Sequence, residues 1–338
     1  MKPVAISCGE PAGIGPEVAA KAWAVLRHDL PMVWIGDPAH LPSGTPLRVV
    51  DDLNGITPDA MAVLVRDFGS PAVAGQPNPT HAQGVIDAIA TGVDLVRSGQ
   101  ASAICTAPIH KAALIAGAGF AYPGHTEYLA ALAGVDRVVM MLACEGLRVV
   151  PATIHIPLAA VPETLTASLL TDTILITHAA LRRQFGIAAP RIAVAGLNPH
   201  AGEDGKMGSE EIEMITPVLD ALRAEGLDIS GPHSADTMFH AAARARYDVA
   251  ICMYHDQALI PIKTIDFAGG VNVTLGLPFI RTSPDHGTAF DIAGRGIADP
   301  ASMIAALRQA ERMAKNFDAS GGDHRDLPKA IHGARKMA

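Results

Sequence analysis

The sequence is poor in aromatic residues and in cysteine. Only 4% of the 338 residues are Phe, Trp or Tyr, whereas 49% are apolar. A core built mainly from Ala, Val, Ile and Leu favours close-packed helix and sheet layers over a β-sandwich or barrel. The cysteines are far apart and form no CxxC pair, which argues against a disulfide framework and against a thiolate metal site. The four are Cys8, Cys105, Cys144 and Cys252.

Basic runs and long apolar runs are also missing from the body of the chain. The formal net charge is −8, and because a nucleic-acid-binding protein is expected to carry a basic face, nucleic acid is not an expected partner. No stretch of about 18 uninterrupted apolar residues occurs, so no membrane span is expected. The apolar run at residues 4–8 is too short for a signal peptide. These absences predict a cytoplasmic protein.

Several familiar catalytic motifs are absent. Residues 9–15 follow a strand-like run and open a helix, but they do not match G-x-G-x-x-G and so fail as a dinucleotide fingerprint. Residues 202–209 have the wrong glycine spacing for a P-loop, and Lys206 is followed by methionine, so a kinase function is rejected. There is no H-E-x-x-H motif and no G-x-S-x-G elbow. The glycines of residues 9–15 are therefore expected to let the chain pass close to a neighbouring segment or an anion.

Short β-branched runs alternate with longer helical patterns along the chain. This alternation predicts an α/β fold with parallel strands and helical crossovers on both faces. Ligands in such folds bind beyond the carboxyl ends of the strands, so polar residues that follow strands are the candidate site residues. Ser209 is expected to cap a helix with Glu210, Glu211 and Glu213 in its first turn. The expected strands are 4–8, 32–36, 103–106, 191–195 and 249–253, and the expected helices include 81–98, 169–185 and 301–314.

Three of the fourteen histidines lie where strands are expected to end, each on a separate loop: His155, His200 and His255. Three neutral imidazoles on a divalent ion would leave positions open for water or substrate, as in catalytic zinc sites. Spacing alone still favours packing roles for them. Further along, Lys263 and Arg281 suit a phosphorylated or carboxylated substrate, although isolated basic residues more often lie on the surface.

An ordered set of motifs resembles the 4-hydroxythreonine-4-phosphate dehydrogenase family of vitamin B6 biosynthesis. The resemblance extends from residue 4 to about residue 315, which is essentially the whole chain. One departure is Glu10, where the family has aspartate. The matching motifs are GEPAGIGPE at 9–17, TAPIHK at 106–111, PGHTEY at 123–128, LNPHAGE at 197–203, YHDQ at 254–257 and GVNVTLGLP at 270–278.

Residues 286–294, HGTAFDIAG, resemble the cofactor loop of isopropylmalate and isocitrate dehydrogenases. In that wider group the adenosine of the cofactor lies against this loop, so no G-x-G-x-x-G is needed. The implied fold is isopropylmalate dehydrogenase-like, with two α/β/α domains and a cleft between them. Residues 1–128 plus 273–338 would form the cofactor-side domain, and residues 129–272 the metal-binding and dimerisation domain.

The family resemblance also assigns roles to individual residues. It implies a homodimer whose active sites are shared, with the third metal ligand supplied by the partner subunit. Asp256, beside a ligand, is either a general base or a residue that orients the ligand histidine. The implied metal ligands are His155, His200 and His255. The implied substrate-binding residues are His125, Thr126, Lys263, Asn272 and Arg281. The implied cofactor-binding residues are His286, Gly287, Asp291 and Ile292, and the candidate catalytic residues are Asp256 and Lys263.

The activity that this resemblance implies is oxidation of 4-phosphohydroxy-L-threonine at its C3 hydroxyl. The resulting 3-keto acid loses carbon dioxide to give 3-amino-2-oxopropyl phosphate, on the route to pyridoxal phosphate. The metal would lower the pKa of the hydroxyl and stabilise the developing charge. Zn²⁺ is expected, with Mg²⁺, Co²⁺ and Ni²⁺ as alternatives. Asp291 and Ile292 indicate NAD, because a carboxylate there repels the 2′-phosphate of the alternative cofactor, NADP.

Two other functions remain open from the sequence. The same machinery could act on another substrate, such as 4-phospho-D-threonate, the corresponding erythronate or a cis-dihydrodiol. A metal-dependent binding or hydrolytic protein that lacks the redox step is the second alternative, but the intact loop at residues 286–294 argues against it.

Overall fold

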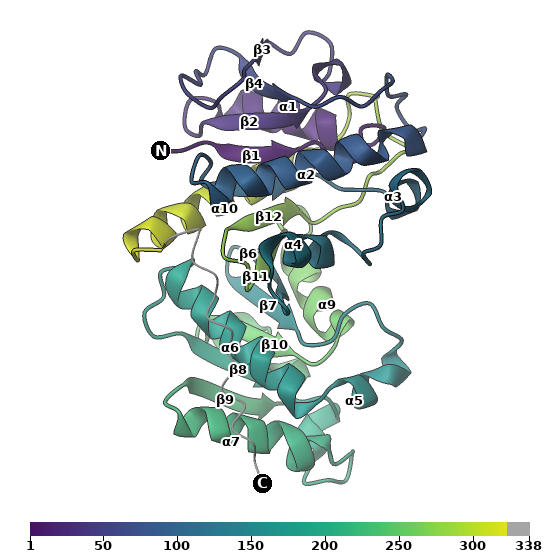
Figure 1. The fold of residues 1–338 in the computed structure, drawn as a ribbon. Coiled ribbons are helices and arrows are strands. Elements are labelled where there is room, and N and C mark those ends of the chain that lie inside the picture. The colour runs from purple at the N-terminus through teal and green to yellow at the C-terminus, as the bar shows by residue number, and fades with distance from the viewer. Residues whose placement is uncertain (323–338) are drawn as a thin grey trace. The chain divides into compact units, whose positions relative to one another are not determined.

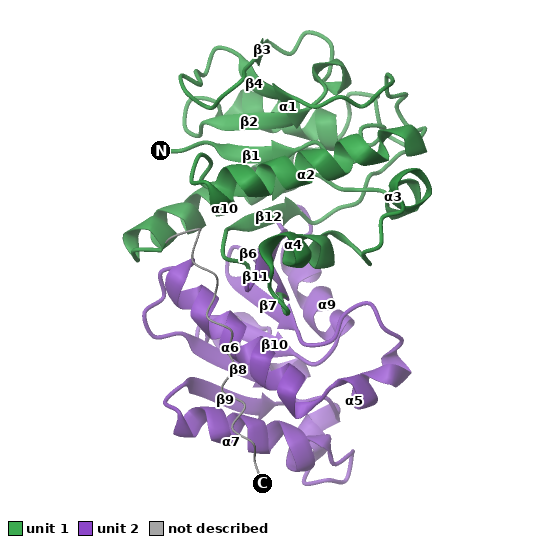
Figure 2. Cartoon of the chain, in the orientation of Figure 1, with its two compact units in different colours: residues 1–138, 277–330 green, residues 139–276, 331–338 purple. Residues whose placement is uncertain are grey.

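The computed structural model describes residues 1–322 and divides into two compact units (Figure 1). Figure 2 colours unit 1, residues 1–138 and 277–330, separately from unit 2, residues 139–276. The predicted boundaries at 128/129 and 272/273 stand beside structural boundaries at 138/139 and 276/277, and residues 323–338 of the predicted first domain lie outside the described residues. Both units contain strands and helices, so the predicted α/β class is confirmed.

In unit 1, six strands pair in parallel with their neighbours to form a sheet. Strands β1, β2 and β5 are buried along their whole length, as expected for a parallel sheet covered by helices on both faces. The strand order is β3 (Leu47–Val49), β4 (Met61–Val65), β2 (Met32–Gly36), β1 (Val4–Ser7), β5 (Ala103–Thr106) and β12 (Arg281–Pro284).

Within residues 1–322, five helices accompany this sheet. Helix α2 packs on β1, β2 and β5 and also contacts α3 and α4, whereas α10 packs on β12, β5 and β1 and contacts α1 (Figure 1). Two short 3₁₀ turns, at Pro38–His40 and Pro79–His81, complete the connections. The helices are α1 (Gly15–Leu26), α2 (Ala82–Arg97), α3 (Lys111–Ala118), α4 (His125–Ala133) and α10 (Ala301–Ala319).

Unit 2 contains a mixed sheet. The strand order is β11 (Val271–Leu275), β6 (Val139–Cys144), β7 (Leu147–Pro151), β10 (Val249–Cys252), β8 (Arg191–Ala195) and β9 (Asp228–His233). The helices are α5 (Val161–Thr164), α6 (Ala167–Arg183), α7 (Thr216–Ala224), α8 (Ala241–Arg244) and α9 (His255–Ile265), with a π-helical segment at Glu211–Ile215 and 3₁₀ turns at Leu158–Ala160, Pro199–Gly202 and Ala235–Thr237.

The expectation of parallel strands throughout is wrong for β6. This strand runs antiparallel to both of its neighbours, β7 and β11. Only Glu145 and Gly146 separate β6 from β7, and Gly146 adopts the left-handed backbone conformation with φ 84°. A two-residue connection permits only a hairpin, because a parallel crossover needs roughly a dozen residues.

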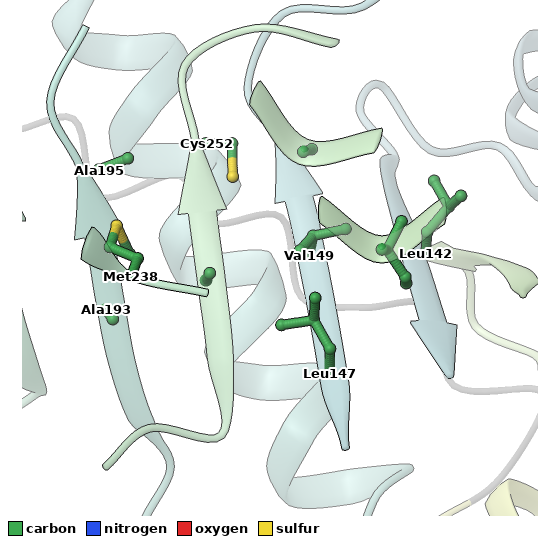
Figure 3. Close-up of a cluster of buried hydrophobic side chains, with 10 residues drawn as sticks. Leu142, Leu147, Val149, Ala193, Ala195, Met238 and Cys252 are labelled. Atoms are coloured by element: carbon green, nitrogen blue, oxygen red, sulfur yellow. The ribbon is translucent and has the colours of Figure 1, made fainter. Parts of the chain in front are cut away.

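The core of unit 2 places the beginning of α9. Ala258 and Ile262 of this helix belong to a buried cluster together with residues of β6, β7, β8 and β10 (Figure 3). Because β7 and β10 are hydrogen-bonded neighbours, the segments that follow them leave the same edge of the sheet. These two segments carry His155 and His255.

No single helix within residues 1–322 is long and apolar enough to cross a membrane. One sharply bent pair of helices, residues 158–164 and 167–183, is long and apolar enough when the two are taken together. The second of these helices is α6, which buries Leu170, Ile174 and Leu181 inside unit 2.

Candidate functional site

His155 lies in the loop after β7, with its backbone at φ 21°. This loop is attached to the end of β10, because the Thr153 hydroxyl donates to the Met253 carbonyl at 2.8 Å and the Ala152 amide donates to the Cys252 carbonyl at 2.8 Å. The attachment brings two residues that are a hundred positions apart to the same place. The ring centroids of His155 and His255 are 5.8 Å apart, with an interplanar angle of 44°.

His255 is the first residue of α9 and follows directly on Tyr254, the N-cap. Gln257 holds this helix start by accepting from the Met253 amide at 2.7 Å and donating to the Gly196 carbonyl at 2.8 Å. The Nδ1 of His255 lies 2.7 Å from Oδ1 of Asp256. A neutral His255 ring that donates Nδ1–H to this carboxylate carries its lone pair on Nε2, which is the arrangement typical of metal-binding histidines.

His200 does not join this pair within one chain. It is exposed and lies in the loop after β8. In the part of the chain that the structure describes, no group of three His, Cys, Asp or Glu side chains could hold a metal ion. The structure therefore brings together two of the three predicted ligands. Their donor type, with a carboxylate behind one imidazole, fits a divalent ion that receives its remaining ligand from elsewhere.

The other predicted residues of unit 2 lie further along the same elements. Lys263 is in the last turn of α9, and its ammonium group lies 5.0 Å from the ring centroid of Phe267. Asn272 lies in β11, paired in register with Leu142 of β6. A cation above an exposed aromatic ring is stabilised by the ring quadrupole, so this contact stabilises the position of the Lys263 ammonium group in unit 2.

Unit 1 contains three predicted substrate-binding residues, and the charge of one of them, Arg281, acts on the His125 ring. His125 and Thr126 are the first two residues of α4, which has Gly124 as its N-cap and no side-chain cap. Arg281 begins β12 and is buried, and it donates from Nε and Nη2 to the Thr106 hydroxyl at 3.1 and 2.7 Å. Burial lowers the pKa of Arg281 to about 10, so the guanidinium remains charged at neutral pH. A helix N-terminus beside a buried cation is suited to binding an anion.

The electrostatics of His125 follow from this position. Burial of the ring, together with the positive charge of Arg281, holds the pKa of His125 well below its usual range. The imidazole is therefore neutral at physiological pH and acts as a hydrogen-bonding group. Burial also lowers the pKa of His40, which lies in the same unit.

These shifts predict that the protein loses stability in mild acid. A histidine whose pKa is depressed on folding binds its proton in the unfolded chain first, so the free energy of unfolding falls as the pH drops below about 6.5. We expect His125→Gln to make the decrease between pH 6.5 and pH 5 smaller than in the wild type. Thermal unfolding measured over this range tests the prediction, with the same substitution at the exposed His28 as control. An unchanged slope in His125→Gln would contradict it.

The predicted cofactor loop packs against the glycine-rich turn of residues 9–15. The Ile14 amide donates to the Thr288 carbonyl at 2.9 Å. A Cβ atom at Gly13 would lie 2.9 Å from that same carbonyl oxygen, which explains the glycine by close approach rather than by a dinucleotide fingerprint. Ala289 adopts a positive φ of 44° in this loop.

His286, Gly287, Asp291 and Ile292 all lie in this loop. The His286 Nδ1 is 2.9 Å from the Gly287 carbonyl oxygen, and Asp291 is exposed. A pocket of about 590 Å³ lies beside the loop. Its lining in unit 1 includes Gly13, Trp23, His40, Ala74, Gly294 and Gly296.

Sequence reasoning missed the residues that hold the end of this loop. Glu17, in the first turn of α1, accepts from the backbone amides of Gly296 and Ala298 at 3.2 and 2.8 Å. Lys21, one turn further along the helix, donates to the carbonyls of the same two residues at 3.0 and 2.7 Å and to Glu17 at 2.8 Å. The i, i+4 spacing of Glu17 and Lys21 indicates an ion pair on the helix. It does not reveal the loop segment that both side chains bind, which lies more than 270 residues away in the sequence.

Glu10 also has a local structural role. Its side chain is buried, and it accepts from the Ala12 amide at 3.1 Å within the glycine-rich turn. Burial raises the pKa of this carboxyl group. Glutamate, which is one methylene longer than the aspartate of the family, is therefore accommodated inside the turn.

Comparison with known proteins supports the assignment of this arrangement to a family. Residues 29–310 match the family model described as "Pyridoxal phosphate biosynthetic protein PdxA". A 4-hydroxythreonine-4-phosphate dehydrogenase of Ruegeria sp. (strain TM1040) is 64% identical over 315 residues, which are 92% of this chain and 97% of the relative.

Solved structures agree with this result. The crystal structure of a 4-hydroxythreonine-4-phosphate dehydrogenase from Klebsiella pneumoniae superposes with a TM-score of 0.86 at 39% identity, over 93% of this chain and 98% of the other. A terephthalate 1,2-cis-dihydrodiol dehydrogenase from Burkholderia xenovorans LB400 is less similar, with a TM-score of 0.64 and 29% identity over 92% and 98% of the two chains. With most of its length matched by the family model and by relatives well above 30% identity, this chain belongs to the PdxA family of pyridoxal phosphate biosynthetic proteins.

Proposed function

We propose that this protein is a metal- and NAD-dependent 4-hydroxythreonine-4-phosphate dehydrogenase that acts in pyridoxal phosphate biosynthesis. The observation that carries the proposal is the pair of His155 and His255, with Asp256 behind the second ring. The substrate, 4-phosphohydroxy-L-threonine, is taken from the names of the relatives. The cytoplasm is the expected location, because biosynthetic dehydrogenases draw on its pool of cofactor.

The chemistry divides between the bound groups and the residues of the chain. A divalent ion held by His155 and His255 would supply Lewis acidity at the substrate hydroxyl, and a bound NAD would supply the acceptor for the hydride from C3, while the hydroxyl proton goes to a base. The products are the 3-keto acid, NADH and one proton. The β-keto acid then loses carbon dioxide and takes up a proton to give 3-amino-2-oxopropyl phosphate.

The residues of the chain bind and orient the substrate in this scheme. Arg281 provides a buried positive charge for an anionic group of the substrate, and neutral His125 and Thr126 provide hydrogen bonds beside it. Lys263 and Asn272 are proposed as further substrate-binding residues on the family resemblance alone. The 2.7 Å contact of Asp256 with Nδ1 of His255 favours an orienting role for this carboxylate over the role of general base.

The metal is proposed to be Zn²⁺, because imidazole donors and an open position suit this ion. The third ligand is proposed to be His200 of the partner subunit in a homodimer. Two observations support the homodimer: His200 lies apart from the other two histidines, and unit 2 exposes large apolar side chains. These exposed residues include Met207, Ile212, Ile260 and Phe267. Metal analysis of the purified protein and its mass in solution test these two points separately.

The adenosine of NAD is proposed to occupy the pocket beside residues 286–294. We expect a higher kcat/KM with NAD than with NADP, because the exposed Asp291 carboxylate repels a 2′-phosphate. Asp291→Asn is expected to reduce this preference by about tenfold, since it removes one like-charge contact. The measurement is kcat/KM with both cofactors, and Asp299→Asn serves as control. Equal preference in wild type and Asp291→Asn would contradict the prediction.

The assay that tests the proposed function compares substrates. We expect NAD reduction and release of carbon dioxide with 4-phosphohydroxy-L-threonine, and much slower NAD reduction with 4-phospho-D-threonate or a cis-dihydrodiol. Reduction of NAD with phosphothreonate at a higher kcat/KM would assign the chain to the alternative substrate class. Failure to bind NAD in a fluorescence titration would contradict a dehydrogenase function altogether.

A further inference from the structure

The loop that carries His200 has an unusual backbone. Residues 200–205 all have positive φ values, and four of these six residues are not glycine. A left-handed conformation brings Cβ close to the following carbonyl oxygen, so each non-glycine residue in it is strained. Such a turn persists only where the surrounding contacts impose it. The φ values are 53° at His200, 52° at Ala201, 82° at Gly202, 43° at Glu203, 55° at Asp204 and 88° at Gly205.

Glu211 supplies contacts that impose this turn. Its side chain is buried at the start of the π-helical segment Glu211–Ile215. Oε1 accepts from the backbone amide of Asn198 at 2.8 Å, and Oε2 accepts from the side-chain amide of the same residue at 2.9 Å. Asn198 is the residue from which the turn begins, since its carbonyl accepts from the Ala201 amide at 3.1 Å. One carboxylate therefore binds both the backbone amide and the side-chain amide of Asn198, which lies two residues before His200.

Two glycines leave the space that this carboxylate occupies. A Cβ atom at Gly196, the residue after β8, would lie 2.9 Å from Oε1 of Glu211 and 2.9 Å from Cα of Ala201. A Cβ atom at Gly202 would lie 2.8 Å from Oε2. The carboxylate is thus enclosed by the strand end on one side and by the left-handed turn on the other. Its position and that of the turn depend on each other.

We infer that Glu211 is a positioning residue for His200, acting through Asn198 and the left-handed turn to present this imidazole to a metal ion. The inference rests on the proposed function, in which His200 is a metal ligand. Residues that orient a ligand typically change metal affinity by about 10–100-fold when they are replaced. Glu211 and Asp256 would orient their ligands in different ways. Asp256 contacts the ring of His255, whereas Glu211 holds the backbone of the loop that carries His200.

The test is Glu211→Gln in the full-length protein. The amide group replaces one acceptor with a donor, which then faces a donor of Asn198. We expect the affinity for Zn²⁺, measured by chelator competition, to fall by about 10–100-fold. The visible absorption of the Co²⁺-loaded protein is expected to change as His200 leaves the ion. Glu213→Gln is the matched control, because Glu213 is exposed on the same segment, and it is expected to bind both metals as the wild type does.

Two further measurements separate positioning from loss of folding. Gly196→Ala presses on the same carboxylate without changing its charge, and we expect it to lower metal affinity in the same direction. In the metal-free protein, trypsin is expected to cut after the exposed Lys206 faster in Glu211→Gln than in Glu213→Gln. Wild-type Zn²⁺ affinity and Co²⁺ absorption in both Glu211→Gln and Gly196→Ala would overturn the inference alone. A wild-type protein that binds neither metal would overturn the proposed function and the positioning role with it.

Discussion

Replacing His200 with alanine is expected to abolish both metal content and turnover. A bound metal contributes several kcal/mol to transition-state stabilisation, and each 1.4 kcal/mol or so corresponds to a factor of ten, so kcat/KM should fall by about a thousandfold or more. His200 is exposed, so the metal-free variant should unfold within about 0.5 kcal/mol of the metal-free wild type. Metal analysis, kinetics and thermal unfolding check the three parts. Full activity without metal would refute the proposed site.

A mixture of two inactive variants tests whether the site is shared. If His155 and His255 come from one subunit and His200 from the other, a heterodimer of His155→Ala and His200→Ala contains one intact set of ligands and one set with two ligands missing. With random assortment half of the dimers are heterodimers, so the mixture should recover about a quarter of wild-type activity. Mixing either variant with itself is the control. If all three histidines came from one chain, the mixture would stay inactive.

Replacing Arg281 with methionine is expected to lower kcat/KM for the phosphorylated substrate by about 100-fold. Hydrogen bonds to a charged group contribute about 1.5–3 kcal/mol, which corresponds to roughly 10–150-fold in binding. The effect should fall on the KM of the substrate, whereas the KM of NAD should change little. Because burial lowers the pKa of Arg281 to about 10, the wild-type protein should bind the substrate less tightly as the pH rises past this value.

The matched control for Arg281→Met is Arg308→Met. Arg308 lies in α10 of the same unit and pairs with Asp29 at 2.6 Å near the surface. The same change of side chain there should leave both KM values unaltered, because an exposed ion pair contributes little. An Arg281→Met variant with a wild-type KM for the substrate would place the anionic group of the substrate elsewhere.

Much of the secondary structure could be predicted from hydrophobic runs alone. The expected strands 32–36, 103–106 and 191–195 coincide with β2, β5 and β8. These strands are buried, or nearly so, along their length, and continuous apolar runs of this kind are typical of parallel strands. The expected helix 301–314 is confirmed by α10, which continues to Ala319. Helix α4 was not predicted, because it is short and its apolar periodicity is weak.

The candidate site was less accessible to sequence reasoning. His155, His200 and His255 were found because each follows an expected strand end, but local spacing favoured packing roles for all three. Glu211 lies in the first turn of its helical segment as expected, but its carboxylate accepts from Asn198, and the segment begins without a side-chain cap from Ser209. The local sequence does not show that Glu211 is buried. Glu210 and Glu213 are also glutamates in the first turn of the same expected helix, so residue type and position do not distinguish the three.

The sequence by itself determined which residues follow strands, which segments form helices and which family motifs occur in order. These properties depend on short-range periodicity and on residue identity, both of which are visible along the chain. Only the tertiary structure decided which of these residues meet. His155 and His255 lie together because β7 and β10 are neighbours, and Arg281 reaches Thr106 across 175 residues because β12 lies beside β5. Strand order is set by the packing of the whole unit, and local periodicity carries no information about it.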